Sequence, residues 1–369
     1  MEYPKFKVTV SCMTYNQSKY ITDAMNGFTM QQTSFPFVCT IVDDASTDGE
    51  QDVIRKYVED KFDFSEGSVA FHKETDYAHI TYAQHKTNKN CYFAVLYLKE
   101  NHYSQRKDKS PYLTEWRDGV EYMAICEGDD YWIVLDKLEK QVNYLDSKKD
   151  YVMCFMGAIH LEESTHTKDD SIWRKYRNNN RDISNSGKIE TFFSIMNVDC
   201  RIPTLTTMYR YGAFQKVPKN DVMFMMGDTP LWLDLSQIGK IGYIDEISAV
   251  YRIVSNSACH NKDTAAQFSL SMYEMRVYYC YKYHFDIPLL IKQKYNNAYC
   301  RYLIVDKKKV HVPMYPLFDC HYKYRIVSKV GFNHPFVAKL LLTVIDRTSS
   351  LKEKIKSLLQ ILQPTLYCN

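Results

Sequence analysis

The sequence predicts an α/β protein in which a mixed, mainly parallel sheet is flanked by helices, and three observations support this fold class. Strand-like and helix-like stretches alternate over the first 150 residues. Two clusters of acidic residues each follow directly on an apolar, strand-like run. Beyond about residue 262 the pattern becomes helical and rich in tyrosine. The alternation is typical of a parallel sheet with helices on its faces, and the last stretch predicts a helical C-terminal extension.

The first 60 residues show the alternation most clearly. Apolar residues at every second position from Phe6 to Cys12 predict a strand, and the apolar run at residues 37–42 predicts a second, buried strand. Apolar residues recur at helical spacing in residues 20–28 and again in residues 53–58. The predicted order is therefore strand, helix, strand, helix.

A third strand and helix are predicted at residues 121–126 and 138–145. The residues before them, 72–119, are too many for a plain connection, so we expect a helix around residues 92–98. Residues 161–188 are polar and aperiodic, which is typical of either a surface loop or a lid over a site.

Length and composition limit the kind of protein. A chain of 369 residues, 45% of them hydrophobic, is long enough for one large core and an appended module. We find neither a signal-peptide pattern nor an uninterrupted run of about 18 apolar residues, and therefore expect a cytoplasmic protein. The eleven cysteines include no CxxC pair, and we interpret them as buried thiols rather than metal ligands or disulfides.

Charge is distributed unevenly along the chain. Residues 261–369 hold 17 Lys or Arg against 7 Asp or Glu, whereas residues 1–260 hold 30 against 37. No helix-turn-helix, zinc-finger or RNP-like run accompanies the basic part, so we expect no nucleic-acid partner. Residues 338–362 place leucines and isoleucines at helical spacing with lysines between them. They predict an amphipathic helix, packed either on the preceding domain or on an anionic membrane surface.

The two acidic clusters are DDASTD at residues 43–48 and EGDD at residues 127–130. In open α/β sheets, ligands bind at the carboxyl ends of the strands, where these clusters are expected to meet. Their carboxylates would repel one another unless a cation lay between them, and Mg²⁺ or Mn²⁺ bridging two phosphates meets that need. For Asp48 alone, an ordinary helix N-cap is an equal alternative. An EF-hand beginning at Asp44 is excluded, because Arg55 stands where a bidentate Glu is required.

Longer runs around these clusters resemble a known family. The runs are VTVSCMTYNQSKYI, IVDDASTDG, YMAICEGDDYWIVLDKLEKQVNYL and MGDTPLWLDLSQIGKIGYIDEISAVYRI, in that order. They resemble the family 2 glycosyltransferases of the bacterial polysaccharide type, over roughly residues 6–260. The resemblance implies the GT-A fold of nucleotide-diphospho-sugar transferases. It implies a catalytic domain at residues 1–260, with a donor-binding half at 1–150 and an acceptor half at 151–260, and then a basic helical extension at 261–369.

The resemblance also assigns the donor site. It implies that Asp43 and Asp44 hold the uracil and ribose of the donor. Tyr15, directly after the first strand, resembles the residue that lies against the base, and the alternative for it is one more half-buried tyrosine among 31.

The metal site implied by the resemblance is the EGDD cluster. Asp129 is then the ligand of Mg²⁺ or Mn²⁺, Glu127 stands where the family usually has Asp, and Asp130 is a neighbour in the sugar or acceptor pocket. Gly128 removes a side chain beside two acids, which suits close approach by a ligand. Arg252 and His260 lie where some relatives place diphosphate or metal contacts, although a lone His is more often structural.

Asp228, in MGDTPLW, resembles the general base of the family. The alternative is a helix N-cap ahead of Pro230, and one residue could serve both purposes. A base is needed because an acceptor hydroxyl is a poor nucleophile and must lose its proton as it attacks the anomeric carbon. A carboxylate on the face opposite the diphosphate gives displacement with inversion, while the metal stabilises the departing diphosphate.

The resemblance therefore predicts an inverting transferase that moves a sugar from a nucleotide-diphosphate donor, expected to be UDP-linked, to a hydroxyl of a glycan or lipid-linked glycan. The location expected is the cytoplasm or the inner face of the cell membrane. A sugar nucleotidyltransferase is a rival, but such enzymes usually carry a Gly-rich loop where this chain has Thr14-Tyr15-Asn16-Gln17. A catalytically inactive carbohydrate-binding relative is a second rival. Loss of an acid would have favoured it, and neither cluster has lost one.

Overall fold

The structure is a computed structural model that describes residues 4–197, 202–219, 222–254, 264–305 and 313–318. The chain divides into two compact units, one of residues 1–221 with 227–255 and the other of residues 222–226 with 256–369. The domain boundary expected at residue 260 stays a prediction, because residues 255–263 lie outside the described ranges.

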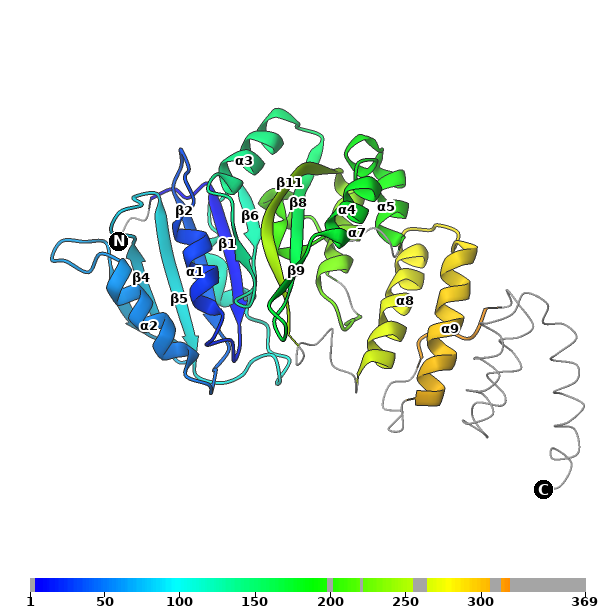
Figure 1. Cartoon of the computed structure of the whole chain (residues 1–369), viewed down its shortest axis with the longest axis horizontal. Coiled ribbons are helices and arrows are strands. Elements are labelled where there is room, and N and C mark those ends of the chain that lie inside the picture. Colours follow the sequence, from blue (N-terminus) through cyan, green and yellow to red (C-terminus); the bar gives the residue numbers. More distant parts are fainter. Residues whose placement is uncertain (1–3, 198–201, 220–221, 255–263, 306–312, 319–369) are drawn as a thin grey trace, which may run out of the picture. The chain divides into compact units, whose positions relative to one another are not determined.

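The first unit is built on one mixed sheet (Figure 1). Within the described ranges the sheet has eleven strands in the order β3-β4-β5-β2-β1-β6-β10-β8-β11-β7, with β9 paired to β8. Its centre consists of four parallel strands, β5 (Cys91–Leu98), β2 (Phe37–Asp43), β1 (Val8–Thr14) and β6 (Tyr122–Ile125). The predicted α/β class with a mixed sheet is confirmed. Because these strands point the same way, their carboxyl ends meet at one edge.

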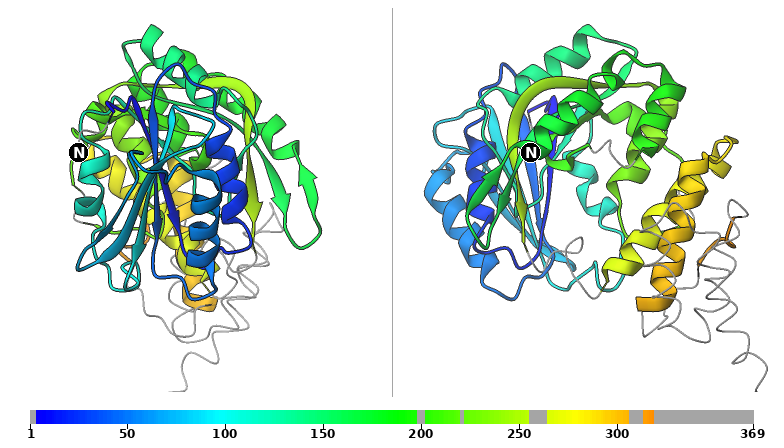
Figure 2. Two further views of the ribbon diagram at one scale, coloured as in Figure 1. Left: turned by 90° about the vertical axis from the view of Figure 1, so that its left-hand side faces the viewer. Right: turned by 45° about the vertical axis from the view of Figure 1, so that its right-hand side comes forward.

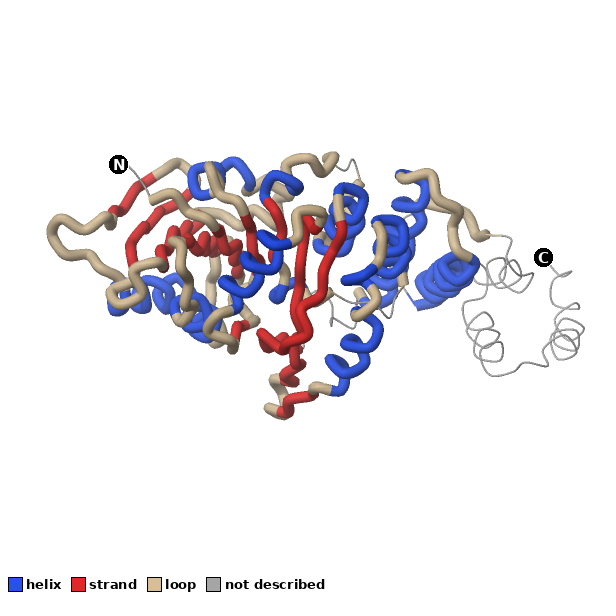
Figure 3. Tube along the Cα trace, turned by 90° about the horizontal axis from the view of Figure 1, so that it is seen from above, coloured by secondary structure: helices blue, strands red, loops and turns tan. Residues whose placement is uncertain are grey.

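Further strands extend the sheet on both sides of this centre, and Figure 3 shows the strands in red from above. The hairpin of β3 and β4 pairs with β5, and β10 joins β6 to β8. The long strand β11 runs parallel to β8 and pairs with the short strand β7 that follows the second acidic cluster. The bounds are β3 Phe71–Glu74, β4 Ala78–Gln84, β7 Tyr131–Trp132, β8 Tyr151–Glu162, β9 Thr167–Asp169, β10 Met208–Arg210 and β11 Lys240–Ile253.

Helices cover the parallel centre as the apolar spacing predicts. α1 (Ile21–Thr29) and α2 (Glu50–Lys61) lie side by side on one face of the sheet (Figure 2), and α3 (Lys137–Ser147) follows the second acidic cluster. All three confirm helices predicted from the sequence. The remaining helices of this unit are η1 Ser110–Trp116, α4 Ser171–Asn180, η2 Ile183–Asn185, α5 Lys188–Met196, η3 Thr204–Thr206, α6 Tyr211–Phe214 and α7 Asp228–Ile238, where η marks 3-10 helices.

The helix expected around residues 92–98 is wrong, because these residues form β5. All eight residues of β5 are buried, with Phe93 and Val95 in the core cluster on one face of the sheet and Ala94 and Leu96 in the cluster on the other. A strand that is buried on both faces has apolar residues without alternation. Periodicity alone cannot separate such a run from a buried helix.

The loop or lid expected at residues 161–188 is also wrong, since β9, α4 and η2 form there. α4 carries no broad apolar stripe and is held by polar contacts. Arg177 forms an ion pair with Asp245 of β11 at 2.9 Å, and Arg174 forms one with Asp170 at 2.9 Å. A helix stabilised by ion pairs shows no hydrophobic period, and for this reason the sequence pattern missed it.

The second unit contains α8 (Ala265–Lys282) and α9 (Leu289–Val305), which pack against each other. Tyrosines at positions 273, 279, 295 and 302 of these helices are buried, in the stretch where the sequence predicts tyrosine-rich helices. The amphipathic helix predicted at residues 338–362 lies outside the described residues. None of the described helices is long and apolar enough to cross a membrane. The described cysteines are free, buried thiols, as predicted.

Candidate active site

The loops that follow β1 and β2 interlock at the carboxyl edge of the sheet. The backbone N–H of Asp44 donates to the carbonyl of Thr14 at 3.0 Å, and that of Asn16 donates to Ser46 Oγ at 2.9 Å. Asn16 and Ala45 both have positive φ, 55° and 61°, in the left-handed region that side chains disfavour. Backbone strain of this kind concentrates at functional loops, where surrounding contacts hold it in place.

Glu50, which the sequence analysis did not single out, ties these two loops together. It is fully buried at the start of α2. One carboxylate oxygen accepts a hydrogen bond from Thr14 Oγ1, and the other accepts from the backbone N–H of Gln17 and from Ser46 Oγ, both at 2.8 Å. Burial raises the pKa of Glu50, against the effect of these hydrogen bonds. An acid in the first turn of a helix is ordinary in a sequence, so only the fold identifies this one.

Asp43, at the end of β2, is fully buried. Its Oδ1 accepts hydrogen bonds from the backbone N–H of Ser46 at 3.0 Å and from Gln51 Nε2 at 2.7 Å. Its Oδ2 is buried and has no hydrogen-bond partner among the described residues. A buried carboxylate oxygen without a donor is costly, and it leaves one acceptor of this residue unused by the protein.

Asp44 accepts hydrogen bonds from the loop after β5. Its two oxygens accept the backbone N–H groups of His102 at 2.8 Å and Tyr103 at 3.0 Å, and Lys109 Nζ approaches Oδ2 at 2.8 Å. The structure therefore places Asp44 between the ends of β2 and β5. Tyr15 stands nearby after β1 with 45% of its side chain exposed. The contacts of Asp43, Asp44 and Tyr15 with a donor base remain predictions.

The second acidic cluster lies directly against the loop after β1. The backbone N–H of Gly128 donates to the carbonyl of Met13 at 3.2 Å. A Cβ at Gly128 would stand 2.3 Å from Thr14 Oγ1 and 2.6 Å from Gln17 Oε1, so only glycine permits this approach. The structure thus brings the two acidic clusters to the same edge of the sheet.

Asp130 is held by β11. Its Oδ1 accepts the backbone N–H of Arg252 at 2.8 Å, and only 3% of the residue is exposed. Burial first, and then the negative charges of Asp129 and Glu127, raise the pKa of Asp130 well above its usual value. This acid lies deep in the cluster and is not a surface group.

Arg252 clamps the cluster through its side chain. The guanidinium donates to the carbonyl of Asp129 at 2.8 Å, to Asp23 Oδ2 at 2.5 Å and to Glu163 Oε2 at 3.1 Å. It also lies over the ring of Tyr131 at 4.9 Å. The resemblance places Arg252 where some relatives have diphosphate contacts. In the structure Arg252 is 7% exposed, and its guanidinium donates to Asp129, Asp23 and Glu163.

Glu127, Asp129 and Asp228 share one electrostatic environment. Burial, and then the charges of Asp129 and Asp228, raise the pKa of Glu127 to about 7. Burial also raises the pKa of Asp129, although Arg252 and Gln17 act in the opposite direction. In the described ranges no group of three or more His, Cys, Asp or Glu has the arrangement to hold a metal by itself. The cluster does fit a hard divalent cation that takes one or two carboxylates and fills its other positions with phosphate oxygens and water.

Asp228 is the first residue of α7. Its Oδ2 accepts the hydroxyl of Thr204 at 2.8 Å, and its Oδ1 accepts the backbone N–H of Thr229 at 2.6 Å. Gly227 occupies the N-cap position, and Asp228 accepts a backbone N–H of the first turn, so the roles of general base and of helix cap both stay predictions for Asp228. His260, the other predicted metal contact, lies outside the described residues.

Comparison with solved structures identifies the fold. The chain superposes on a mannosyltransferase from Pyrobaculum calidifontis, solved in complex with GDP-Man and Mn²⁺, with a TM-score of 0.50 and 12% identity. The match covers 94% of this chain and 90% of the mannosyltransferase. The chain has a glycosyltransferase fold. No protein-family model matches it.

One of the sequence relatives carries the name of a glycosyltransferase. TuaG of Bacillus subtilis, a glycosyltransferase named for teichuronic acid biosynthesis, is 24% identical over 267 residues, which is 72% of this chain and 86% of TuaG. A protein of Mycobacterium tuberculosis is 28% identical over 262 residues, or 70% of this chain. The match spans 62% of the length of that mycobacterial protein.

Proposed function

We propose that the chain is an inverting glycosyltransferase, which moves a sugar from a nucleotide-diphosphate donor, expected to be UDP-linked, to a hydroxyl of a glycan or lipid-linked glycan. One observation carries the proposal. The loop after β6, which carries Glu127 and Asp129, lies against the end of β1 at the carboxyl edge of the sheet. Burial, and then the charges of Asp129 and Asp228, raise the pKa of Glu127, so Asp228 of α7 lies near enough to act on this loop. The name of TuaG supports a glycosyltransferase, and the GDP-Man and Mn²⁺ bound to the mannosyltransferase support a nucleotide-diphosphate donor and a divalent metal.

The acidic cluster is proposed to hold Mg²⁺ or Mn²⁺, with Asp129 as the ligand and Glu127 beside it. When bound, the ion supplies Lewis-acid stabilisation to the leaving diphosphate. The chain's own residues fix the loop that presents Asp129. Arg252 holds the carbonyl of Asp129, Gly128 lets the loop lie against Thr14, and the N–H of Arg252 holds the carboxylate of Asp130.

Asp228 is proposed as the general base. Thr204 and the N–H of Thr229 donate to its two oxygens and fix the plane of the carboxylate. Oδ1 also accepts the hydroxyl of Thr229 at 3.2 Å, whereas Oδ2 accepts only from Thr204 among the described residues. Oδ2 therefore has a second lone pair, to which a hydroxyl of the acceptor could donate and lose its proton during attack. Attack from the side opposite the diphosphate inverts the anomeric configuration.

The nucleotide is proposed to lie at the ends of β1 and β2. Tyr15 has an exposed ring that suits stacking against a base, and Asp43 has one buried oxygen without a donor. The acceptor and the cellular location are inferred from the resemblance. We propose polysaccharide assembly of the cell envelope, in the cytoplasm or at the inner face of the membrane, with the basic extension nearest the lipid.

A donor screen tests this function. The purified chain is incubated with UDP-sugars and GDP-sugars and with Mn²⁺, and nucleotide release is measured with and without oligosaccharide acceptors. We expect one donor to be consumed, with product of inverted anomeric configuration by NMR. Synthesis of a nucleotide-sugar from a sugar phosphate and a nucleoside triphosphate would favour the nucleotidyltransferase. Nucleotide binding without turnover of any donor would favour an inactive carbohydrate-binding relative.

A further inference from the structure

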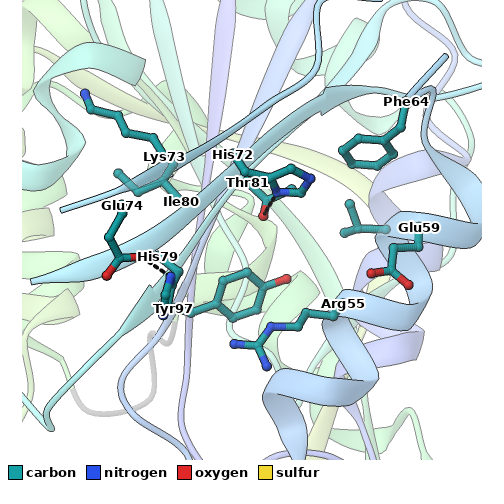
Figure 4. A pocket seen from close by; sticks show the side chains of 11 residues that line it. Arg55, Glu59, Phe64, His72, Lys73, Glu74, His79, Ile80, Thr81 and Tyr97 are labelled. Atoms are coloured by element: carbon teal, nitrogen blue, oxygen red, sulfur yellow. Dashed lines mark hydrogen bonds and ion pairs between the residues drawn. The ribbon is translucent and has the colours of Figure 1, made fainter. Parts of the chain in front are cut away.

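A cavity of about 450 Å³ opens in the first unit between α2 and the hairpin of β3 and β4 (Figure 4). Its apolar part includes Val58 of α2 and Ile80 of β4, which are almost fully buried. None of the acidic residues of the candidate active site lines this cavity. It is therefore a separate site, which the transferase mechanism does not use.

Tyr97 of β5 provides an unused polar group in the cavity wall. The residue is 2% exposed, and its hydroxyl has no hydrogen-bond partner within the described ranges. Figure 4 shows the ring extending beneath Thr81 and beside Arg55, with the hydroxyl pointing into the space that the lining residues enclose. The guanidinium of Arg55 lies 4.7 Å from the ring centroid. A buried hydroxyl without a hydrogen-bond partner is unfavourable, and a ligand that bonds to it would remove that cost.

The walls combine flat apolar surface with donors and acceptors. The rings of Phe64 and His72 are parallel to within 3°, with centroids 5.3 Å apart, and both line the cavity. Arg55 and Lys73 provide donors at the rim, and Glu59 provides an acceptor.

The charges of this rim are balanced. Arg55 pairs with Asp52 at 3.2 Å, Lys73 approaches Glu115 at 3.9 Å, and Glu74 of the rim pairs with Lys99. A paired rim has little net attraction for a simple ion. It offers donors and acceptors to a neutral ligand that carries several hydroxyl groups.

We propose that this cavity binds a neutral pyranose unit. The apolar face of the sugar ring would lie against the open face of one ring of the stacked pair Phe64 and His72, one hydroxyl would bond to Tyr97, and others would reach the rim. Burial of an aliphatic ring face against aromatic side chains, with a few fixed polar contacts, is the usual composition of a small-ligand site. The inference depends on the cavity alone and does not require that the chain transfers sugar.

The test is saturation-transfer NMR of the full chain with glucose, N-acetylglucosamine and glucuronic acid. We expect glucose or N-acetylglucosamine to bind, and to bind at least as well as glucuronic acid. Tyr97→Phe removes only the hydroxyl and should weaken binding about threefold to tenfold. Thr81→Trp fills the cavity from β4 and should abolish binding. Tyr144→Phe is the matched control, because it also removes a buried hydroxyl without a described partner but lies outside the cavity.

Thermal unfolding of each variant verifies that it is folded, and nucleotide release should be unchanged in Tyr97→Phe. The proposal is overturned if none of the three sugars binds the wild-type chain. It is equally overturned if binding survives in a folded Thr81→Trp variant, or if Tyr97→Phe and Tyr144→Phe both leave the affinity unchanged. Binding of inorganic phosphate, with no neutral sugar bound, would show an anion site instead.

Discussion

The backbone N–H of Arg252 donates a hydrogen bond to Asp130 Oδ1 at 2.8 Å, across 122 positions of sequence. The guanidinium of the same residue holds the carbonyl of Asp129. The end of β11 therefore determines the shape of the acidic loop that follows β6. Local sequence alone would leave that loop free to adopt other conformations, because its own acids repel one another.

Asp129→Asn should abolish metal-dependent nucleotide release and leave the fold intact. The substitution keeps the size and the backbone contact to Arg252 but removes the charge that a divalent cation needs. Release by the wild-type chain should require Mg²⁺ or Mn²⁺. Donor hydrolysis is measured with each metal and in excess EDTA, beside a thermal unfolding curve. Full activity in EDTA would exclude the metal assignment.

Asp228→Asn tests whether Asp228 acts as the general base or has only a structural role. Asn keeps the size and one oxygen for the Thr204 hydrogen bond, but it cannot take a proton. Nucleotide affinity, measured by calorimetry, should persist, while acceptor-dependent turnover falls by roughly 10²- to 10⁴-fold. Thr204→Val serves as a control that removes the orienting hydroxyl and should cost much less. Near-normal turnover in Asp228→Asn would move the assignment to Asp130.

The charge state of Glu127 should make stability depend on pH. Its pKa is raised from 4.5 to about 7 in the folded chain, so over this interval the unfolded chain binds fewer protons than the folded one. Stability must then fall as pH rises from about 4.5 towards 7. The loss from this group is on the order of 2–3 kcal/mol once pH exceeds 7.

Glu127→Gln should remove that loss, since Gln carries no charge to bury. The free energy of unfolding is measured in denaturant at pH 5 and pH 8 without divalent metal, with the exposed Glu121→Gln as the control. Addition of Mn²⁺ at pH 8 should raise the stability of the wild-type chain more than that of Glu127→Gln. Identical pH slopes for wild type and Glu127→Gln would contradict the argument.

Glu50→Ala should destabilise the chain and weaken nucleotide binding together. The substitution leaves Thr14 Oγ1, the N–H of Gln17 and Ser46 Oγ without their common acceptor. These groups belong to the loops that are proposed to bind the nucleotide. The expected loss of stability is about 2–4 kcal/mol, with at least tenfold weaker nucleotide binding. Asp52→Ala, an exposed acid on the same helix, should change neither. Normal nucleotide affinity in a folded Glu50→Ala chain would refute the positioning role.

The basic extension should bind anionic membrane surface. Residues 338–362 lie outside the described part of the chain, so this prediction is based on their leucine stripe and on the positive balance of residues 261–369. Flotation with vesicles containing anionic lipid compares the whole chain with a chain ending at residue 337. We expect only the whole chain to float, and less of it at high salt. Equal behaviour of the two chains would count against membrane contact.

The sequence was sufficient for three of the four parallel strands at the centre of the sheet and for the meeting of its two acidic clusters. β1, β2 and β6 each show an apolar run, and each acidic cluster follows directly on one of these strands. Parallel strands present their carboxyl ends at one edge, so adjacency of the clusters follows from chain direction alone. Two predictions were wrong because the apolar spacing did not reflect the final surroundings. β5 was predicted as a helix because it is apolar on both faces, and α4 was predicted as a loop because ion pairs, and not a broad apolar stripe, contribute to holding it.

Tertiary structure alone decided how the site is assembled. The sequence shows an acid at residue 50 and an arginine at residue 252, but it does not show which groups these side chains contact. Glu50 joins the loops after β1 and β2 by hydrogen bonds because α2 begins beside them. Arg252 binds the acidic loop after β6 because β11 ends beside that loop. A hydrogen bond forms only when donor and acceptor lie within about 3.2 Å of each other. Hydrogen bonds between residues far apart in the chain therefore depend on how the strands of the whole sheet are arranged, which no short stretch of sequence encodes.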